Sequence, residues 1–186
     1  ITTVIANKHL LVENVKASSS GGAKAPTADN LLEYYTVDQL RTHFLSQNLN
    51  TLAVNFKSKV FNPEDFEKCG DPVVAQGNIL TNVFNRIIRS VFYSVQTYFD
   101  GKLPKNRPDE KFVKMANELQ HNYVNKMKDI KLNEIMPLLD TYFREVNLNW
   151  SVKSKIDDNS VRAQLIADTI HAIKTGALLL HPITPK

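Results

Sequence analysis

Three asparagines and two arginines share one face of the longest helix that the sequence predicts. Asn78, Asn82, Asn85 and Arg89 are spaced by four, three and four residues, and Arg86 follows Asn82 by four. Residues at this spacing lie on the same side of a helix. Asn is a mediocre helix former, so three of them on a face without a carboxylate are unusual. Because amides and guanidinium groups bind base edges and phosphates, this face predicts a nucleic-acid contact. A merely solvated face is the alternative.

Trp150 is the only tryptophan, and we expect it just past the end of a helix, in the run Asn147-Leu-Asn-Trp150. An indole at a helix end is most often a core residue. The functional alternative is a platform on which an unpaired base stacks. The polar neighbours Asn147 and Asn149 favour partial exposure of the indole, and both interpretations stay open.

A loop rich in serine and glycine, residues 18–22, lies between Lys16 and Lys24. Backbone amides in such a loop can hold a phosphate, although the same composition is typical of flexible linkers. The five histidines show no spacing typical of metal ligands, so we expect no metal site. No Ser-His-Asp or Cys-His arrangement is evident. The residues by themselves therefore do not predict an enzyme.

The composition is that of a globular protein with one domain and a small part of another. Of the 186 residues, 42% are hydrophobic and 23% are charged, which excludes a disordered tail or a coiled-coil rod. The single cysteine, Cys69, excludes an internal disulfide and favours a reducing, cytoplasmic location. The longest apolar run, 177–180, is far too short to span a bilayer. A net charge of +4 is compatible with a nucleic-acid partner.

Hydrophobic periodicity predicts a mostly helical chain after a β-rich start. Residues 1–15 favour strands, and a buried strand at 1–6 leads us to expect a fragment cut inside a larger, sheet-containing domain. Thr36 and Gln39 have the spacing of a capping box. Four longer helices are expected, at about 71–100, 108–127, 132–146 and 160–180. The short connections between them predict an α-helical bundle.

Several short segments, taken in order, resemble methionyl-tRNA synthetase, a class I aminoacyl-tRNA synthetase. Residues 1–20, ITTVIANKHLLVENVKASSS, are similar to the strands that lead into the family's KMSKS loop. Asp38-Gln-Leu-Arg41, followed by Phe44-Leu45, resembles the D-A-L-R-Y-x-L segment beyond it. Asn82-Val-Phe-Asn-Arg86 resembles N-x-x-N-R, and Tyr98-Phe-Asp-Gly101 resembles Y-F-D-G. Asn149-Trp150 stands where the family usually has Pro-Trp, and 179–185 resembles its closing L-x-P-x-x-P.

This resemblance, which covers nearly the whole chain, implies an all-α fold: the anticodon-binding helical bundle of a class I synthetase, preceded by a short β-rich remnant of the catalytic domain. It assigns 1–60 to the end of the catalytic domain, with a KMSKS-like loop and a stem-contact region, and 61–186 to the anticodon-binding domain. In the family an Asn, an Arg and the Trp recognise the CAU anticodon. Here they would be Asn82, Arg86 and Trp150. Because the segment from Arg86 to Phe99 is about one turn longer than in the family, Asn85 and Arg89 are the alternative pair.

The KMSKS-like loop departs from the family, since it is Lys16-Ala-Ser-Ser-Ser20. The resemblance makes Lys16, Ser18 and Ser20 the candidate catalytic residues. Ser19 replaces the lysine that, in the family, stabilises the transition state for pyrophosphate release. ATP and Mg²⁺ are implied for the parent enzyme and no cofactor for this fragment. The family's HIGH motif and amino-acid pocket are not in these residues, so we expect the fragment alone to be inactive as a ligase.

Three hypotheses follow. The first is the C-terminal part of a methionyl-tRNA synthetase or a close paralogue, with tRNA and an N-terminal catalytic domain as partners and no membrane contact. The second is a non-catalytic tRNA-binding or scaffold bundle, which the replacement at Ser19 favours. The third is a helical interaction domain with no RNA role. Binding to RNA separates the third hypothesis from the other two.

Overall fold

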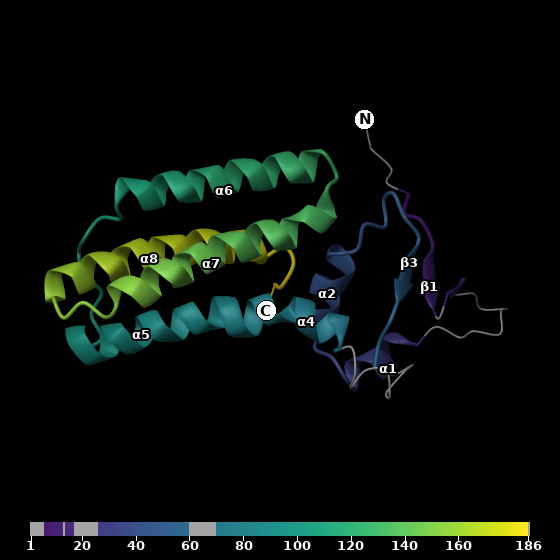
Figure 1. The fold of residues 1–186 in the computed structure, drawn as a ribbon, viewed down its shortest axis with the longest axis horizontal. Helices are drawn as coiled ribbons and strands as arrows, with labels where there is room; N and C mark the ends of the chain where they lie inside the picture. Colours follow the sequence, from purple (N-terminus) through teal and green to yellow (C-terminus); the bar gives the residue numbers. More distant parts are fainter. Residues whose placement is uncertain (1–5, 13, 17–25, 60–69, 186) are drawn as a thin grey trace. The chain divides into compact units, whose positions relative to one another are not determined.

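The computed structural model describes residues 6–12, 14–16, 26–59 and 70–185 (Figure 1). The chain divides into two compact units, Ile1–Gly77 and Asn78–Lys186, a boundary later than the 60/61 division that the family resemblance implies. Most described residues are helical, which confirms the expected all-α fold with a short β-rich start. No helix among the described residues is both long and apolar enough to cross a membrane.

The first unit combines a small sheet with short helices. β1 (Leu10–Val12) pairs antiparallel with β2 (Val15–Lys16) and parallel with β3 (Val54–Phe56), in the order β2-β1-β3. The sequence did not predict β3, because three residues are too few to show an alternating pattern. The strand expected at 1–6 falls almost wholly outside the described residues. Among its described residues, the helices are α1 (Ala28–Leu32), α2 (Val37–Leu45) and α4 (Pro72–Asn78).

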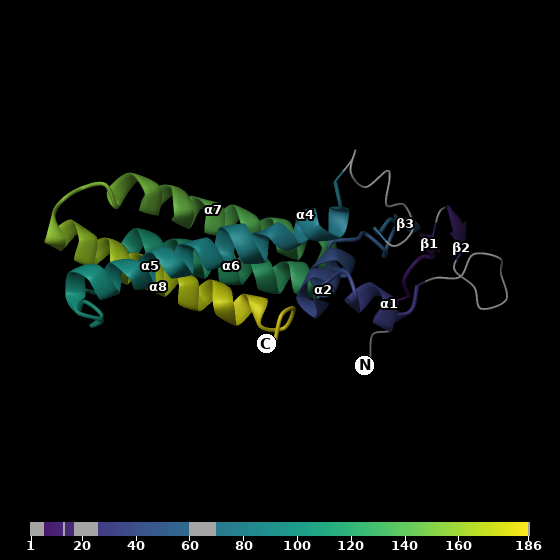
Figure 2. The same cartoon turned by 90° about the horizontal axis from the view of Figure 1, so that it is seen from below.

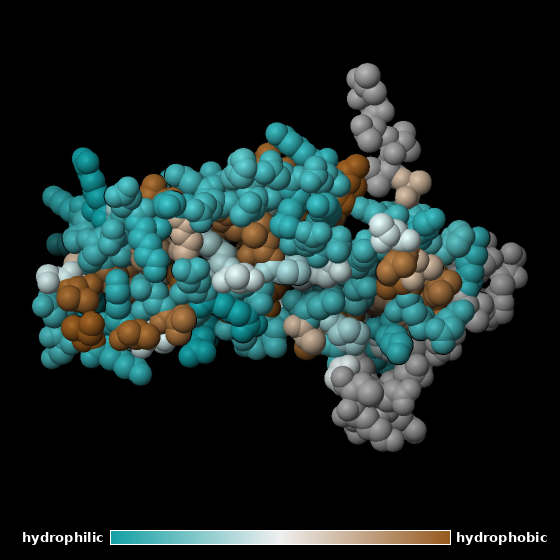
Figure 3. All heavy atoms as spheres, turned by 45° about the horizontal axis from the view of Figure 1, so that its top comes forward, coloured by the Kyte–Doolittle hydropathy of each residue, from teal (hydrophilic) through white to brown (hydrophobic). Residues whose placement is uncertain are grey.

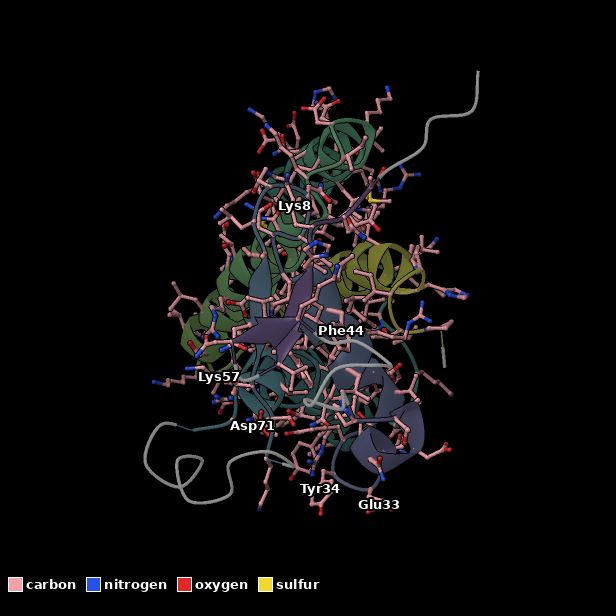
Figure 4. The ribbon with its side chains drawn as sticks, turned by 90° about the vertical axis from the view of Figure 1, so that its right-hand side faces the viewer. Lys8, Glu33, Tyr34, Phe44, Lys57 and Asp71 are labelled. Carbon is pink, nitrogen blue, oxygen red and sulfur yellow. The ribbon has the colours of Figure 1, made fainter. Side chains whose placement is uncertain are left out.

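Local sequence signals set where these helices begin. The Gln39 amide donates to Thr36 Oγ1 (3.2 Å) and the Thr36 amide donates to Gln39 Oε1 (2.9 Å), which confirms the predicted capping box at α2. Asp71 Oδ1 accepts from the Val73 amide (2.8 Å) where α4 begins. Phe44 lies beside the sheet, whereas Tyr34 points outward near the end of α1 (Figure 4).

His43 makes the first unit sensitive to acid. Its ring is buried against Phe44 and Phe56, and its Nδ1 lies 2.6 Å from Gln76 Oε1. Burial lowers the pKa of His43, and it outweighs the opposing effects of Gln76 and the Asp71 carboxylate. His43 is therefore protonated less readily in the folded state than in the unfolded state, where the imidazole binds a proton below about pH 6.5.

We therefore expect the free energy of unfolding to fall as the pH drops from about 7 to 5. Urea unfolding of the whole chain at a series of pH values measures this loss. The loss should be smaller in His43→Gln and unchanged in the control His121→Gln, which removes an exposed imidazole. Equal pH dependence in the wild type and in His43→Gln would contradict the assignment.

The second unit is an up-down-up-down bundle of four long helices. A π-helix, η1 (Ile79–Phe84), leads directly into α5 (Asn85–Phe99), and α6 (Glu110–Lys128) returns. A 3₁₀ turn, η2 (Leu132–Glu134), precedes α7 (Ile135–Lys153), and α8 (Asn159–Leu180) closes the bundle. Figures 1 and 2 show that each helix runs antiparallel to the one before it. The predicted bundle is thus confirmed.

Two helix boundaries differ from the prediction. The expected long helix is interrupted by η1, in which the Asn85 amide donates to the Leu80 carbonyl five residues back. The third helix continues beyond Val146 to Lys153. The Asn147 amide explains this extension, because its Nδ2 donates to the Phe143 carbonyl (2.8 Å) and to the Val83 carbonyl of η1 (3.1 Å). A residue that the sequence marked as a helix ending is instead held in the helix by its side chain.

Gly176 lets α7 and α8 approach each other closely. A Cβ at this position would lie 2.1 Å from Phe143 Cζ, inside van der Waals contact. Phe143 is fully buried and its ring also packs on Phe84, with centroids 4.6 Å apart, so it has little room to move.

Gly176→Ala should therefore destabilise the bundle by about 1–3 kcal/mol, as overpacking does, even though Ala favours a helix over Gly by about 1 kcal/mol. Urea unfolding measures the change. The control Leu178→Ala alters an exposed residue of the same helix and should shift stability by less than about 0.5 kcal/mol. A Gly176→Ala protein as stable as the wild type would show that α7 and α8 do not pack this closely.

Candidate nucleic-acid interface

An open groove of about 970 Å³ lies on the second unit, between α5, the end of α7 and the start of α8. η1 and α5 supply most of its lining. Four residues that the sequence singled out line it together, from segments up to 68 positions apart: Asn82, Arg86, Arg89 and Trp150. The polar helix face and the tryptophan therefore line the same groove, although nothing in the sequence indicated that they lie close together.

The groove is cationic and aromatic. Its described lining contains three arginines and four aromatic residues, and no carboxylate: Arg86, Arg89, Arg162, Phe92, Tyr93, Tyr98 and Trp150. Guanidinium groups bind phosphates and base edges, and aromatic rings stack on bases. Such a combination can bind an anionic, planar ligand such as single-stranded nucleic acid.

The expected single polar face of the long helix is divided in the structure. Asn82 lines the groove, and its Nδ2 donates to Asn78 Oδ1. Asn85 is exposed but is not part of the lining. The groove therefore brings Asn82 together with both candidate arginines and leaves Asn85 outside.

Trp150 differs from the sequence expectation in both position and exposure. It lies inside α7, not past its end, and only 9% of its surface is exposed. Asn147 is not a sign that the indole is exposed, because its side chain is used to join α7 to η1. Trp150 is therefore a core residue that also lines the groove. Its burial confirms the core interpretation, and a role in base stacking stays a prediction.

Arg162 is a groove residue that the sequence analysis missed. Its guanidinium lies 3.7 Å from the centroid of the Tyr98 ring. Nη1 donates to Asn159 Oδ1 (2.7 Å) and Nη2 donates to Asp157 Oδ1 (3.3 Å). The residue is 8% exposed, although it is charged. A signal was present in the sequence, since Arg162 stands three and four positions before the buried Leu165 and Ile166, on the apolar face of α8.

The start of α8, which carries Arg162, is fixed by Asp158. Its Oδ1 accepts from the Ser160 hydroxyl (2.7 Å) and from the amides of Ser160 (2.7 Å) and Val161 (3.3 Å). These hydrogen bonds lower the pKa of Asp158, and the bond from the Ser160 hydroxyl has the largest effect. The cap holds the first turn of α8 and thereby the position of Arg162.

The candidate catalytic loop is mostly beyond what the structure describes. Lys16 is exposed at the end of β2, whereas Ser18 and Ser20 lie outside the described residues. Their role in a KMSKS-like loop therefore stays a prediction. Within the described ranges, no group of His, Cys, Asp and Glu side chains is arranged to hold a metal ion.

Comparison with solved structures identifies a similar fold. The apo, free-state crystal structure of methionyl-tRNA synthetase from Mycobacterium tuberculosis superposes with a TM-score of 0.64 at 17% sequence identity. The match covers 83% of this chain and 32% of the solved one. The chain has a synthetase-like fold. It spans about a third of the solved synthetase, and the likeness at this identity concerns the fold alone. No protein-family model and no curated protein sequence matches the chain.

Because Trp150 is nearly buried, we expect Trp150→Ala to cost about 3–5 kcal/mol of stability, the usual range for removing a core tryptophan. Trp150→Phe keeps an aromatic ring in the core and should cost less. Chemical denaturation, followed by far-ultraviolet circular dichroism, measures both variants. A loss below about 1 kcal/mol for Trp150→Ala would contradict its role in the core.

Proposed function

We propose that this chain binds the anticodon loop of a tRNA, as the C-terminal part of a methionyl-tRNA synthetase that attaches methionine to tRNA with ATP. The groove is the observation that carries the proposal. It places an amide, three guanidinium groups and four aromatic residues along one surface without a carboxylate. The synthetase-like fold adds independent support.

The residues of the groove suit distinct parts of an unpaired RNA loop. The exposed amide of Asn82 can donate to and accept from a base edge, and the exposed Arg86 can bind a base edge or a phosphate. Arg89 lies almost one turn further along α5 and extends the cationic surface. Trp150 lines the groove and forms part of the wall against which a base would rest. Of the two register alternatives, the groove favours Asn82 with Arg86 and retains Arg89.

In this proposal the ligase chemistry belongs to the parent enzyme. ATP and Mg²⁺ would act in a catalytic domain that precedes this chain, with Lys16 and the following serines contributing the KMSKS-like loop. A cytoplasmic location is part of the same proposal, because a chain with a single cysteine suits a reducing compartment.

A second candidate function is a tRNA-binding or scaffold bundle whose parent lacks ligase activity. The observation that favours it is Ser19, which replaces the second lysine of the KMSKS pattern. The parent's upstream sequence separates the two candidates. An H-x-G-H segment with a methionine pocket favours the ligase, and their absence favours the binding protein.

We expect Asn82→Ala and Arg86→Ala to weaken the binding of an anticodon stem-loop RNA by about 5- to 150-fold, the range of 1–3 kcal/mol for a good base contact. Both side chains are exposed, so stability should change by less than about 0.5 kcal/mol. Fluorescence anisotropy of a labelled RNA measures the affinity at one fixed salt concentration, because phosphate contacts make affinity strongly dependent on salt.

Two matched variants serve as controls. Arg144→Ala removes an exposed arginine of α7 that does not line the groove, and Asn85→Ala removes the neighbouring amide that lies outside it. Neither should weaken binding as much as the groove variants. If all four variants bind equally well, RNA does not occupy the groove. If Arg86→Ala loses stability and keeps its affinity, Arg86 has a structural role.

A further inference from the structure

The groove continues well beyond the residues to which the first base is assigned. Arg86 and Tyr98 both line it and lie twelve positions apart in α5. At 1.5 Å per residue this is about 18 Å, whereas each nucleotide of a stacked strand advances only about 3.4 Å along the strand axis. One base next to Arg86 and Trp150 would therefore leave the part formed by the end of α5 unfilled.

That part of the groove is built from aromatic residues that the core does not need. The apolar stripe of α5 is complete in Ile87, Val91 and Val95, which are all buried. Phe92 and Tyr93 nevertheless remain 57% and 70% exposed and line the groove. Large aromatic rings that stay exposed although the helix already has a complete buried face are typical of binding surfaces.

Arg162 gives the same part of the groove a fixed positive charge. Its stacking on Tyr98 and its hydrogen bonds to Asn159 and Asp157 hold the guanidinium in one orientation. The Asp157 side chain is fully exposed, so water competes for it and the ion pair is weak. The remaining guanidinium N–H groups can donate to a phosphate with little further loss of side-chain entropy.

We propose that Tyr93, Tyr98 and Arg162 form a second nucleotide subsite in the groove, a proposal that rests on the function proposed above. Its ligand is a further nucleotide of the same loop, beyond the one at Trp150. The base stacks on Tyr93, and the phosphate binds Arg162, which Tyr98 orients. The occupant is single-stranded RNA because the lining is cationic and has no carboxylate among the described residues. Single-stranded RNA offers both groups that this subsite binds, a base that can stack on an aromatic ring and a phosphate that can pair with an arginine.

A protein partner is the competing occupant that the test must reject. Hydrophobic residues gather at the same end of the bundle, where α7 ends and α8 begins (Figure 3). Exposed apolar side chains there include Leu148, Val152 and Ile156. They are not part of the groove lining, so an effect on a protein contact can be separated from an effect on RNA.

The test uses the full chain and an anticodon stem-loop RNA that carries 2-aminopurine at successive loop positions, because this base loses fluorescence when it stacks. Tyr93→Ala should weaken binding about 5- to 150-fold, the 1–3 kcal/mol of one stacked base, and should restore fluorescence at a single loop position. Tyr93→Phe keeps the ring and should bind as the wild type does. Tyr34→Ala removes an exposed tyrosine of the first unit and should have no effect.

Arg162→Gln tests the phosphate contact independently. The loss of one phosphate contact should reduce the slope of log affinity against log salt by about 0.7, whereas the control Arg144→Gln should leave the slope unchanged. Because Arg162 is nearly buried, Arg162→Lys is measured as well. It retains the charge and should keep the salt slope even if stability falls.

The outcomes separate the two proposals. If the wild-type chain does not bind the RNA, both the second subsite and the proposed function fail. If Arg86→Ala weakens binding but Tyr93→Ala does not, the second subsite is wrong and the proposed function stands. If Tyr93→Ala keeps its RNA affinity but changes the sedimentation coefficient of the chain, the rings form a protein contact and the subsite is again wrong.

Discussion

The packing of one aromatic ring determines the spacing of the three helices that form the groove. Phe143 of α7 is fully buried, contacts the ring of Phe84 on one side and leaves room for no side chain larger than that of Gly176 on another. A ring held on both sides is rigid because protein interiors are close-packed. The separation of α7 from α5 and from α8 is thus set in the core, and the groove residues take their positions from it.

Hydrogen bonds in the same core fix the helices along their axes. Asn147 joins α7 to the Val83 carbonyl of η1, and the buried Tyr142 hydroxyl donates to the Ala172 carbonyl of α8 (3.2 Å). Burial raises the pKa of Tyr142, so this hydroxyl keeps its proton and remains a donor at physiological pH. Directional bonds of this kind prevent sliding that apolar contacts alone would permit. They hold Trp150 at the level of α5 where Arg86 and Arg89 project.

The sequence predicted the parts of this architecture that depend on local signals. Apolar residues at helical spacing identified the four helices, and Thr36 with Gln39 identified the start of α2. The sequence did not predict the π-helix, because its apolar spacing is that of an ordinary helix; the structure shows one of its carbonyls, that of Val83, accepting from Asn147, 64 positions away. The same contact explains why α7 passes through Asn147 and Asn149 instead of ending there. Trp150 was recognised as notable, but its burial depends on how α7 packs.

In the candidate site, too, the sequence predicted what depends on local signals and missed what depends on contacts between helices. Residue types at helical spacing drew attention to Asn82, Asn85, Arg86 and Arg89 in the sequence, and only the folded bundle shows that Asn85 is not part of the groove lining. Arg162 and Tyr98 belong to different helices, and their contact exists only in the folded bundle. The placement of Ser18 and Ser20 lies outside the described residues, so the KMSKS-like loop stays a prediction.

The most direct measurement of the central claim is the tryptophan fluorescence of the chain, because all of it comes from Trp150. Binding of RNA in the groove should change the emission, because Trp150 lines the groove and its surroundings then change. An anticodon stem-loop with the sequence CAU should give a saturable change at lower RNA concentrations than a loop with an altered anticodon. An RNA that binds, as shown by its own anisotropy, while the emission of Trp150 stays constant would contradict the account.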